Sequence, residues 1–356
     1  MSTSEPNRKS VGLIRTLIVD DSPFVRKIVR EMLSRSPFIE VIGMARDGDE
    51  ALELAAELKP DVITCDLTMP IKNGVDFVRA QMARQPVPIL ILSASPADGD
   101  NVLEAINAGA VDFVQKPTAM ASHDLLAVRD ELIEKVKGAA TAPIKNLHPQ
   151  AESLTPPRPA AQPKSTHKAD VVVLGISTGG PQGLRYLIPQ LPADFPVPLL
   201  IVLHMPVGYT ELFAAKLAEQ SKLKVREAQE GDLLEPGLAL IAHAGRHLTI
   251  VRSAAGRVVV RLTMQPVDKP HRPSVDVLFR SAADVFGART LAIVMTGMGD
   301  DGKEGAAWIK AQGGKVFTEA EESCVIYGMP RSVVEAGLSD AAVPLNRMAE
   351  AIMNNI

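Results

Sequence analysis

Three polar side chains that could form a nucleophilic catalytic site follow apolar segments in the C-terminal half of the chain. Ser177 lies in GISTGGP directly after VVVLG, His204 ends VPLLIVLH, and Asp301 closely follows TLAIVMTG. A serine hydroxyl is a poor nucleophile and needs a base to accept its proton, and the base needs a carboxylate to fix its tautomer. Together the three residue types predict acyl transfer at Ser177, with His204 as the base and Asp301 as the orienting acid.

Each of these residues also has an ordinary structural interpretation. A glycine-rich turn between a strand and a helix more often binds a phosphate group, so Ser177 alone is weak evidence. His204 alone could be a hydrogen-bonded histidine at a strand end. Asp300 or Asp301 could cap a helix that begins near Gly302. The joint occurrence of all three residue types favours catalysis.

The turns around these residues also offer donors for an oxyanion. The backbone N–H groups of Thr178 and Met298 lie on glycine-lined turns and are candidates for an oxyanion hole. The chain order Ser, His, Asp differs from the Ser, Asp, His order of α/β-hydrolases, which argues against an ordinary lipase or esterase.

A second set of polar residues lies at strand ends in the N-terminal half: Asp20 and Asp21 after TLIV, Asp66 after DVITC, Ser93 after PILIL, and Lys116 after DFVQ. Converging carboxylates repel one another and favour a divalent cation, and oxygen ligands with retained waters suit Mg²⁺. Such a cation would neutralise a phosphoryl group on Asp66, which Ser93 could hydrogen-bond and Lys116 could pair with. A single strand-end Asp is more often a helix cap, but the complete set predicts a phosphoryl-acceptor pocket.

The elements that must position the second set alternate regularly. The apolar runs TLIVD, EVIGMA, DVITCD, PILILS and DFVQK are separated by helical patterns over 23–33, 49–58, 74–83, 100–108 and 122–136. Strands that alternate with helices predict a doubly wound parallel α/β sheet.

The C-terminal half repeats this alternation. Strand-like runs are VVVLG, VPLLIVLH, LALIAHA, HLTIV, VVVRL, TLAIVMTG and KVFTE, and helical patterns cover 210–219, 275–285 and 302–311. The stretch 238–262 is expected to be antiparallel, with a hairpin turn at 254–256. The sequence therefore predicts a second doubly wound α/β domain that carries a β-hairpin.

Proline-rich sequence separates the two halves and disfavours helix and sheet. The expected organisation is a disordered N-terminus over 1–13, a first domain over 14–138, a linker over 139–168 and a catalytic domain over 169–356.

Composition excludes several functional classes. An aromatic content of 4% and a net charge of −4 argue against nucleic-acid binding. No apolar run reaches the roughly 18 residues that span a bilayer, and no signal peptide is evident, so no direct membrane insertion is expected. Cys65 and Cys324 form no CxxC pair or zinc motif, which favours reduced thiols, a cytoplasmic location and no metal in the second domain.

The N-terminal half resembles the response-regulator receiver family in its Asp pair after the first strand, in Met-Pro at 69–70, in Gly74 and in Lys-Pro at 116–117. The resemblance implies that Asp66 accepts a phosphoryl group from a histidine kinase. It further implies that Asp21, Asp66 and the backbone carbonyl of Thr68 bind the metal.

The C-terminal half is similar to the chemotaxis protein-glutamate methylesterase family in GISTGGP, in LHMP at 203–206, in RPSVDVLFRSAA at 272–283 and in MTGMGDDG at 295–302. The resemblance implies a Ser177, His204, Asp301 triad, with Asp276 as a structural or pocket residue. It also implies demethylation of γ-glutamyl methyl esters on methyl-accepting chemoreceptors, deamidation of receptor glutamines, and a chemotaxis histidine kinase as phosphodonor.

Two positions depart from the family patterns. Thr68 replaces an acidic residue often found before Met-Pro, and His243 replaces the proline of an Ala-Pro-Gly turn. His243 is expected to be a loop substitution, and His247 and His271 are expected to be packing or pocket residues. Cys65 is expected to be a buried strand residue rather than a redox sensor.

Two rival functions follow from the same domain arrangement. A hydrolase of the same fold could act on proteins outside chemotaxis. A receiver-controlled transcription factor would need a basic recognition helix in the second half, and none stands out there.

Overall fold

The structure is a computed structural model that describes residues 12–116, 122–144 and 168–356. Residues 1–11 of the predicted disordered N-terminus, most of the predicted linker and Pro117 lie outside these ranges. The described chain divides into two compact units.

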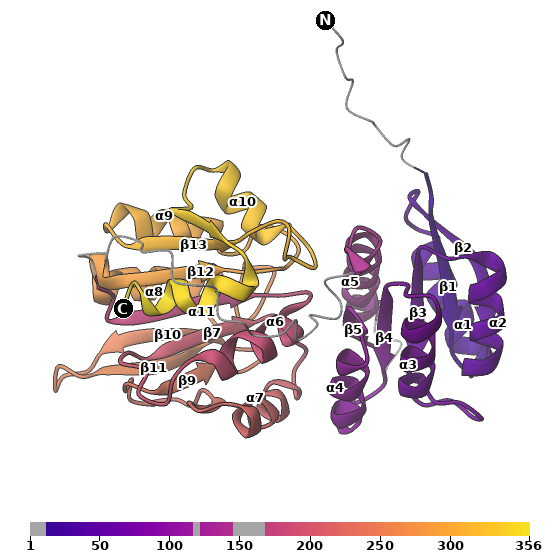
Figure 1. Cartoon of the computed structure of the whole chain (residues 1–356), viewed down its shortest axis with the longest axis horizontal. Coiled ribbons are helices and arrows are strands. Elements are labelled where there is room, and N and C mark those ends of the chain that lie inside the picture. Colours follow the sequence, from indigo (N-terminus) through magenta and orange to yellow (C-terminus); the bar gives the residue numbers. More distant parts are fainter. Residues whose placement is uncertain (1–11, 117–121, 145–167) are drawn as a thin grey trace, which may run out of the picture. The chain divides into compact units, whose positions relative to one another are not determined.

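The N-terminal unit contains a five-stranded parallel sheet in the order β2-β1-β3-β4-β5 (Figure 1). Its strands are β1 (Ile14–Val19), β2 (Ile39–Ala45), β3 (Val62–Asp66), β4 (Ile89–Ser93) and β5 (Asp112–Gln115). Along the chain, these strands alternate with the helices α1 (Pro23–Leu33), α2 (Gly48–Leu58), α3 (Gly74–Arg84), α4 (Gly99–Asn107) and α5 (Ser122–Ala139). This order is the flavodoxin-like form of the doubly wound sheet and confirms the predicted fold class.

Local capping explains where several of these helices begin. The side chain of Ser22 accepts from the backbone N–H of Val25 at the start of α1, and Pro23 occupies the first turn. Asn73 caps α3 in the same way by accepting from the N–H of Asp76. Every residue of β3 and β4 is buried, as expected for central strands covered on both faces.

The C-terminal unit contains a seven-stranded parallel sheet in the order β14-β13-β12-β6-β7-β9-β8. Its strands are β6 (Val171–Ile176), β7 (Leu199–Leu203), β8 (Lys224–Glu227), β9 (Leu238–Ile241), β12 (Thr290–Val294), β13 (Lys315–Glu319) and β14 (Ala341–Val343). Its helices are α6 (Gly180–Leu187), α7 (Thr210–Gln220), α8 (Val275–Phe286), α9 (Lys303–Ala311), α10 (Met329–Glu335) and α11 (Leu345–Met353). The doubly wound fold predicted for this half is confirmed.

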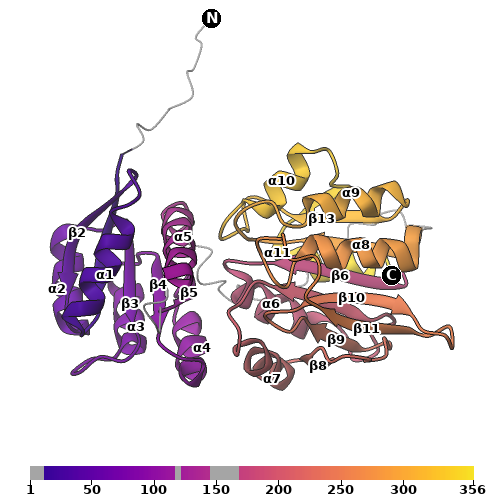
Figure 2. The same cartoon turned by 180° about the vertical axis from the view of Figure 1, so that it is seen from behind.

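A separate antiparallel hairpin consists of β10 (His247–Arg252) and β11 (Val258–Thr263). Apolar side chains of both strands join the buried cluster that includes Leu278 and Phe279 of α8, and Figure 2 shows the hairpin beside this helix.

One prediction about this region is wrong. The stretch 238–262 is not antiparallel throughout, because β9 pairs in parallel with both β7 and β8. The four residues of β9 form a continuous buried apolar run, which is typical of an interior parallel strand. The short strands β8 and β14 were not predicted, because β8 has one apolar residue among three charged ones and β14 is only three residues long.

Among the described residues, no helix combines the length and the apolar character required to cross a membrane.

Candidate functional site

The candidate nucleophile and base lie at the ends of two paired strands. Ile176 of β6 is in register with Leu203 of β7, so Ser177 and His204 are the next residues on neighbouring strands. The backbone N–H of His204 donates to the carbonyl oxygen of Ile176 at 3.1 Å. Because β6 pairs with β12 on its other side, residues that follow all three strands meet at one sheet edge.

The turn that carries Ser177 packs closely against the loop after β12. The backbone N–H of Ser177 donates to the carbonyl oxygen of Thr296 at 3.0 Å. A Cβ atom at Gly297 would lie 2.7 Å from the Cβ of Ser177, so a side chain there would displace the nucleophile. Glycine at 297 therefore lets the two loops approach each other.

His204 and Asp301 form a hydrogen-bonded pair. His204 Nε2 lies 2.9 Å from Asp301 Oδ2, and both side chains are about nine-tenths buried. The other ring nitrogen, Nδ1, is buried and has no partner in the described part of the chain. Among the described residues, no side-chain hydrogen bond joins Ser177 to His204. Because Nε2 is bonded to Asp301, Nδ1 is the ring nitrogen that is available to accept a proton.

Asp301 accepts three further hydrogen bonds around the start of α8. The donors are Ser274 Oγ at 2.8 Å and the backbone N–H groups of Val275 at 2.8 Å and Asp276 at 3.0 Å. Burial alone would raise the pKa of Asp301, but the bonds from His204 and from these amides hold it well below its ordinary value. Asp301 therefore remains a carboxylate, the form that orients an imidazole and stabilises an imidazolium.

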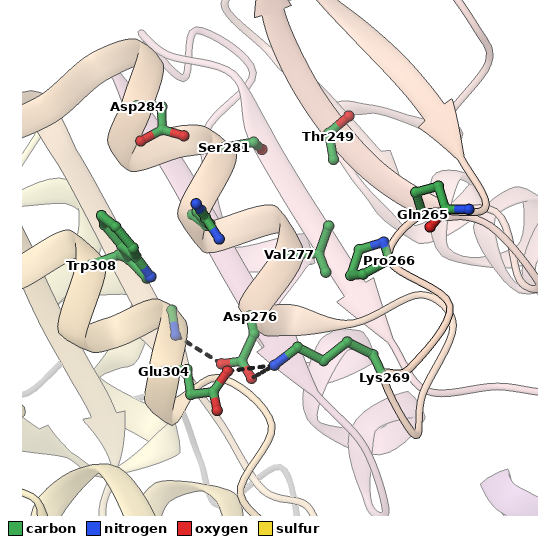
Figure 3. Close-up of a pocket in the computed structure, with 12 residues that line it drawn as sticks. Thr249, Gln265, Pro266, Lys269, Asp276, Val277, Ser281, Asp284, Glu304 and Trp308 are labelled. Atoms are coloured by element: carbon green, nitrogen blue, oxygen red, sulfur yellow. Dashed lines mark hydrogen bonds and ion pairs between the residues drawn. The ribbon is translucent and has the colours of Figure 1, made fainter.

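Asp276 lies behind this acid and faces the start of α9. Its Oδ1 accepts from the N–H groups of Gly302 at 2.9 Å and Gly305 at 2.8 Å, and Lys269 Nζ lies 3.1 Å from its Oδ2. Figure 3 shows Asp276 between Lys269 and the first turn of α9, at the edge of a pocket of about 270 Å³. Burial raises the pKa of Asp276, and the nearby Asp301 charge acts in the same direction. These contacts give Asp276 a supporting position that does not touch His204.

Two other histidines contact residues of the site in different ways. The exposed ring of His271 stacks on His204 with 4.1 Å between ring centroids and 21° between ring planes. His247 is fully buried, with Nε2 2.9 Å from the Pro266 carbonyl oxygen and Nδ1 accepting from Ser274 N–H. Burial lowers the pKa of His247, so it packs as a neutral imidazole.

His243 does not join the catalytic set. Its Nδ1 lies 2.6 Å from the carbonyl oxygen of Ala244, and its Nε2 lies 4.0 Å from Glu227 Oε2 on β8. At the turn position where proline is usual, this chain therefore has a histidine next to Glu227, an acidic residue of the edge strand β8.

The two oxyanion candidates lie on the two loops that pack together. Thr178 is 1% exposed and directly follows the nucleophile, whereas Met298 follows β12. The carbonyl oxygen of Thr178 accepts from Thr296 Oγ1 at 3.0 Å. The role of both N–H groups as oxyanion donors stays a prediction.

The receiver pocket brings three acidic side chains together. Carboxylate oxygens of Asp20, Asp21 and Asp66 lie within 4.8 Å of one another. Lys116 Nζ lies 2.6 Å from Asp20 Oδ2 and 2.8 Å from Asp66 Oδ2. Burial raises the pKa of Asp66, although the hydrogen bond and charge of Lys116 act in the opposite direction. A set of hard oxygen donors this close together fits a divalent cation.

The remaining receiver residues lie at neighbouring strand ends. Ser93 directly follows Leu92, which is in register with Asp66, and Ser93 is 1% exposed. Thr68 is exposed, and its backbone N–H bonds to the Asp66 carboxylate. Cys65 is fully buried, and burial raises its pKa well above the ordinary value, so this thiol lacks the thiolate character of a redox sensor.

Helix α3 can begin directly behind Asp66 because residue 74 is glycine. A Cβ atom at Gly74 would lie only 2.2 Å from the backbone oxygen of Asp66.

Sequence patterns did not identify three residues that hold the catalytic site. Ser274 bonds to Asp301, Thr296 bonds to the nucleophile turn, and Glu319 bonds to Thr296. Ser274 lies inside RPSVDVLFRSAA and Thr296 lies inside MTGMGDDG, but the sequence does not reveal the contacts that either residue makes. The only sequence signal for Glu319 is its position at the end of the strand-like run KVFTE.

Comparison with known proteins identifies both units. A family model described as CheB methylesterase matches residues 172–352, and one described as response regulator receiver domain matches residues 16–127. The chain is 44% identical over 354 residues to a Myxococcus xanthus protein named protein-glutamate methylesterase/protein-glutamine glutaminase 5, covering 97% of this chain and 99% of that protein. It is 41% identical to a protein-glutamate methylesterase/protein-glutamine glutaminase of Halalkalibacterium halodurans, with 96% and 97% covered.

A solved structure agrees with these matches. The crystal structure of the Thermotoga maritima CheB methylesterase catalytic domain is 39% identical, with a TM-score of 0.52, and covers 53% of this chain and 100% of that chain. The chain therefore belongs to the CheB methylesterase family, in the form that carries a response regulator receiver domain ahead of the catalytic domain.

Proposed function

We propose that this protein is a protein-glutamate methylesterase and protein-glutamine glutaminase whose activity is controlled by phosphorylation of Asp66. The observation that carries the catalytic part is the arrangement of His204. Its Nε2 is bonded to Asp301, and its Nδ1 is unpartnered among the described residues, at the strand end next to Ser177.

Acylation uses this arrangement directly. Ser177 Oγ attacks the carbonyl carbon of a γ-glutamyl methyl ester while His204 Nδ1 takes the hydroxyl proton. Asp301 stabilises the resulting imidazolium through the Nε2 hydrogen bond. The N–H groups of Thr178 and Met298 stabilise the oxyanion. The tetrahedral intermediate collapses, the C–O bond to the methoxy group breaks, and His204 returns the proton so that methanol leaves.

Deacylation repeats the sequence with water. Water attacks the acyl-enzyme, His204 accepts its proton, and the bond to Ser177 Oγ breaks with return of the proton to the serine. The product is a free glutamate side chain. A glutamine side chain passes through the same steps with ammonia as the leaving group, which accounts for the glutaminase activity.

The receiver part of the proposal concerns the acidic pocket. Asp21, Asp66 and the backbone carbonyl of Thr68 would hold Mg²⁺, with Asp20 and Lys116 beside them. The ion would supply positive charge that offsets the charge of a phosphoryl group on Asp66. Ser93 would hydrogen-bond that group and Lys116 would pair with it.

The partners and boundaries belong to the same proposal. The substrates are methyl-accepting chemoreceptors, and the phosphodonor is a chemotaxis histidine kinase. The receiver domain covers 14–138, the linker 139–168 and the catalytic domain 169–356. A cytoplasmic location accords with the reduced thiols expected for Cys65 and Cys324, which are both buried.

The test is phosphodonor-dependent release of methanol from membranes that carry methylated chemoreceptors. Ser177→Ala should abolish release, and retained activity would contradict the assignment of the nucleophile. If the wild type released no methanol but bound a DNA probe in a gel-shift assay, the transcription-factor alternative would replace the proposal. If it hydrolysed methyl esters only on other proteins, a function outside chemotaxis would replace it.

A further inference from the structure

The two predicted oxyanion donors belong to different loops, and something must fix the distance between them. Thr178 follows β6, whereas Met298 follows β12. An oxyanion hole stabilises a transition state only when its donors are held in place before the reaction. The residue that joins these loops is Thr296, two positions before Met298.

Thr296 contacts the nucleophile turn through both its backbone and its side chain. Its carbonyl oxygen accepts from Ser177 N–H at 3.0 Å. Its Oγ1 lies 3.0 Å from the Thr178 carbonyl oxygen, the nearer of two acceptors for its proton, and 3.3 Å from the Ile326 carbonyl oxygen. Its Oγ1 also accepts from the N–H of Ile326 at 2.9 Å. Thr296 is 2% exposed, so water cannot readily replace these bonds.

Thr296 is in turn held by a buried acid that the catalytic steps do not use. Its backbone N–H donates to Glu319 Oε2 at 2.9 Å, and the hydroxyl of Ser323 donates to Glu319 Oε1 at 2.9 Å. Glu319 is 1% exposed and ends β13, the strand next to β12. Burial raises its pKa to about 7, although the bonds from Thr296 and Ser323 lower it. A buried carboxyl group with two directed hydrogen bonds fixes the position of its donors.

We infer that Thr296 is a positioning residue that ties the two halves of the oxyanion hole together, and that Glu319 fixes Thr296 from behind. The inference rests on the proposed function, because it takes Thr178 and Met298 as the oxyanion donors. Thr296 and Glu319 are both buried, so both act through the nucleophile turn.

Replacing Thr296 with Val tests the side-chain link. Valine has the shape of threonine but cannot donate to Thr178 or accept from Ile326. Misplacing a reacting group by a fraction of an ångström to one ångström lowers kcat, so we expect a fall of about tenfold to a hundredfold. KM for methylated receptor membranes should stay within about twofold, because ground-state binding is unaffected. Thr296→Ser retains the hydroxyl and should recover most of kcat.

A matched control separates positioning from stability. Thr318 lies on β13, is fully buried, and pairs its hydroxyl with Ser339 at 2.9 Å. Thr318→Val removes a comparable buried hydroxyl bond from the same sheet without touching the nucleophile turn. For every variant that retains Ser177, rates are expressed per active site, counted by labelling Ser177 with a fluorophosphonate to completion; the Ser177→Ala rate is expressed per mole of protein. Thr318→Val should then keep the wild-type kcat even if its melting temperature falls.

The role of Glu319 is tested with two replacements. Glu319→Gln retains an oxygen acceptor for the Thr296 N–H and should keep kcat per active site within about twofold of wild type. Glu319→Leu removes the acceptor, and kcat per active site should fall in the direction of the Thr296→Val value. A wild-type kcat in Glu319→Leu would overturn this part of the inference.

The outcomes distinguish the inference from the function on which it rests. If Ser177→Ala is inactive while Thr296→Val keeps the wild-type kcat per active site, the positioning role is wrong and the proposed function stands. If Ser177→Ala remains active, the proposed function fails and the inference fails with it. Equal losses in Thr296→Val and Thr318→Val per active site would also overturn the inference, because the effect would then be one of general stability.

Discussion

Asp276 and Asp301 cap each other's helices: Asp301 accepts from the N–H groups of Val275 and Asp276 at the start of α8, and Asp276 accepts from Gly302 and Gly305 at the start of α9. A carboxylate at a helix N-terminus satisfies unpaired N–H groups and the positive end of the helix dipole. The triad acid is therefore positioned by two helix termini at once.

Replacing Asp276 with Ala should weaken this arrangement. Two buried N–H groups would lose their acceptor, and we expect the free energy of unfolding to fall by about 2 kcal/mol. Urea unfolding can be followed by fluorescence of Trp308, the single tryptophan of the chain, which lies in α9. Asp276→Asn keeps an oxygen for Gly302 and Gly305 and should lose less stability. Equal losses in both variants would contradict the capping role.

Replacing Asp301 with Asn should remove the orienting carboxylate while keeping its volume. The amide NH₂ group would face His204 Nε2 or lose the bonds to α8, so kcat should fall by about three to four orders of magnitude. The pKa of Asp301 lies below its ordinary value, so its stabilising effect is present above about pH 4 and is lost as the pH falls below that. Methanol release at neutral pH measures the kcat, and acid unfolding of both proteins measures the stability difference. An unchanged kcat would exclude Asp301 as the triad acid.

Glu319 should make stability depend on pH in the opposite sense. Its pKa is raised from 4.5 to about 7, so the folded state binds the proton more tightly than the unfolded state. The stabilising contribution is present below pH 4.5 and is lost as the pH rises through 7. Relative to Glu319→Gln, the wild type should lose about 3 kcal/mol of unfolding free energy between pH 4.5 and 8.

Urea unfolding at several pH values measures this difference. The titratable neighbour Cys324 does not contribute, because burial and then the Glu319 charge raise its pKa far above this range. Parallel pH profiles for wild type and Glu319→Gln would show that Glu319 does not titrate in this window.

Asp66→Asn should remove activation by a phosphodonor and leave basal methanol release intact. The carboxylate is the expected acceptor, and an amide cannot form the acyl phosphate. Chelation of Mg²⁺ should likewise abolish activation of the wild type but leave the basal rate, because the proposed catalytic steps use no metal. Activation of Asp66→Asn to the wild-type level would refute the receiver role.

Ile71 should destabilise the receiver because its backbone is strained. It has a φ of 67°, a value that β-branched residues rarely adopt, and its side chain is 83% exposed. Asn tolerates this conformation, so Ile71→Asn should raise stability by about 1 kcal/mol. Calorimetry of the full chain should show this change in the unfolding transition of the receiver. Trp308 fluorescence does not report that transition, because the single tryptophan lies in α9 of the C-terminal unit. A lower transition temperature would show that the side chain of Ile71 contributes more than the strain costs.

The sequence was most informative where apolar strands end. Parallel strands deliver the residues that follow them to one edge, so the alternation of strands and helices predicted both folds. The same rule predicted which side chains share an edge, and the structure places His204 beside Asp301 and Asp66 beside Lys116.

Contacts that depend on how helices and loops pack could not be read in this way. The reciprocal capping by Asp276 requires the first turns of α8 and α9 to meet, and no local pattern encodes that approach. The same holds for the stacking of His271 on His204 and for the burial of Glu319. The run at 238–241 was misassigned because a short apolar segment gives no sign of its direction, and only its neighbours in the sheet decide it.

The central place of β6 has a consequence for the timing of synthesis. The ribosome adds Ser177 and His204 before β12 and Asp301, which follow about a hundred residues later and insert on the other side of β6. A nascent or truncated chain that stops before β12 thus carries a serine and a histidine without their acid. The triad can assemble only after Asp301 has been made, so a chain that stops before β12 should have the low kcat expected for loss of the triad acid.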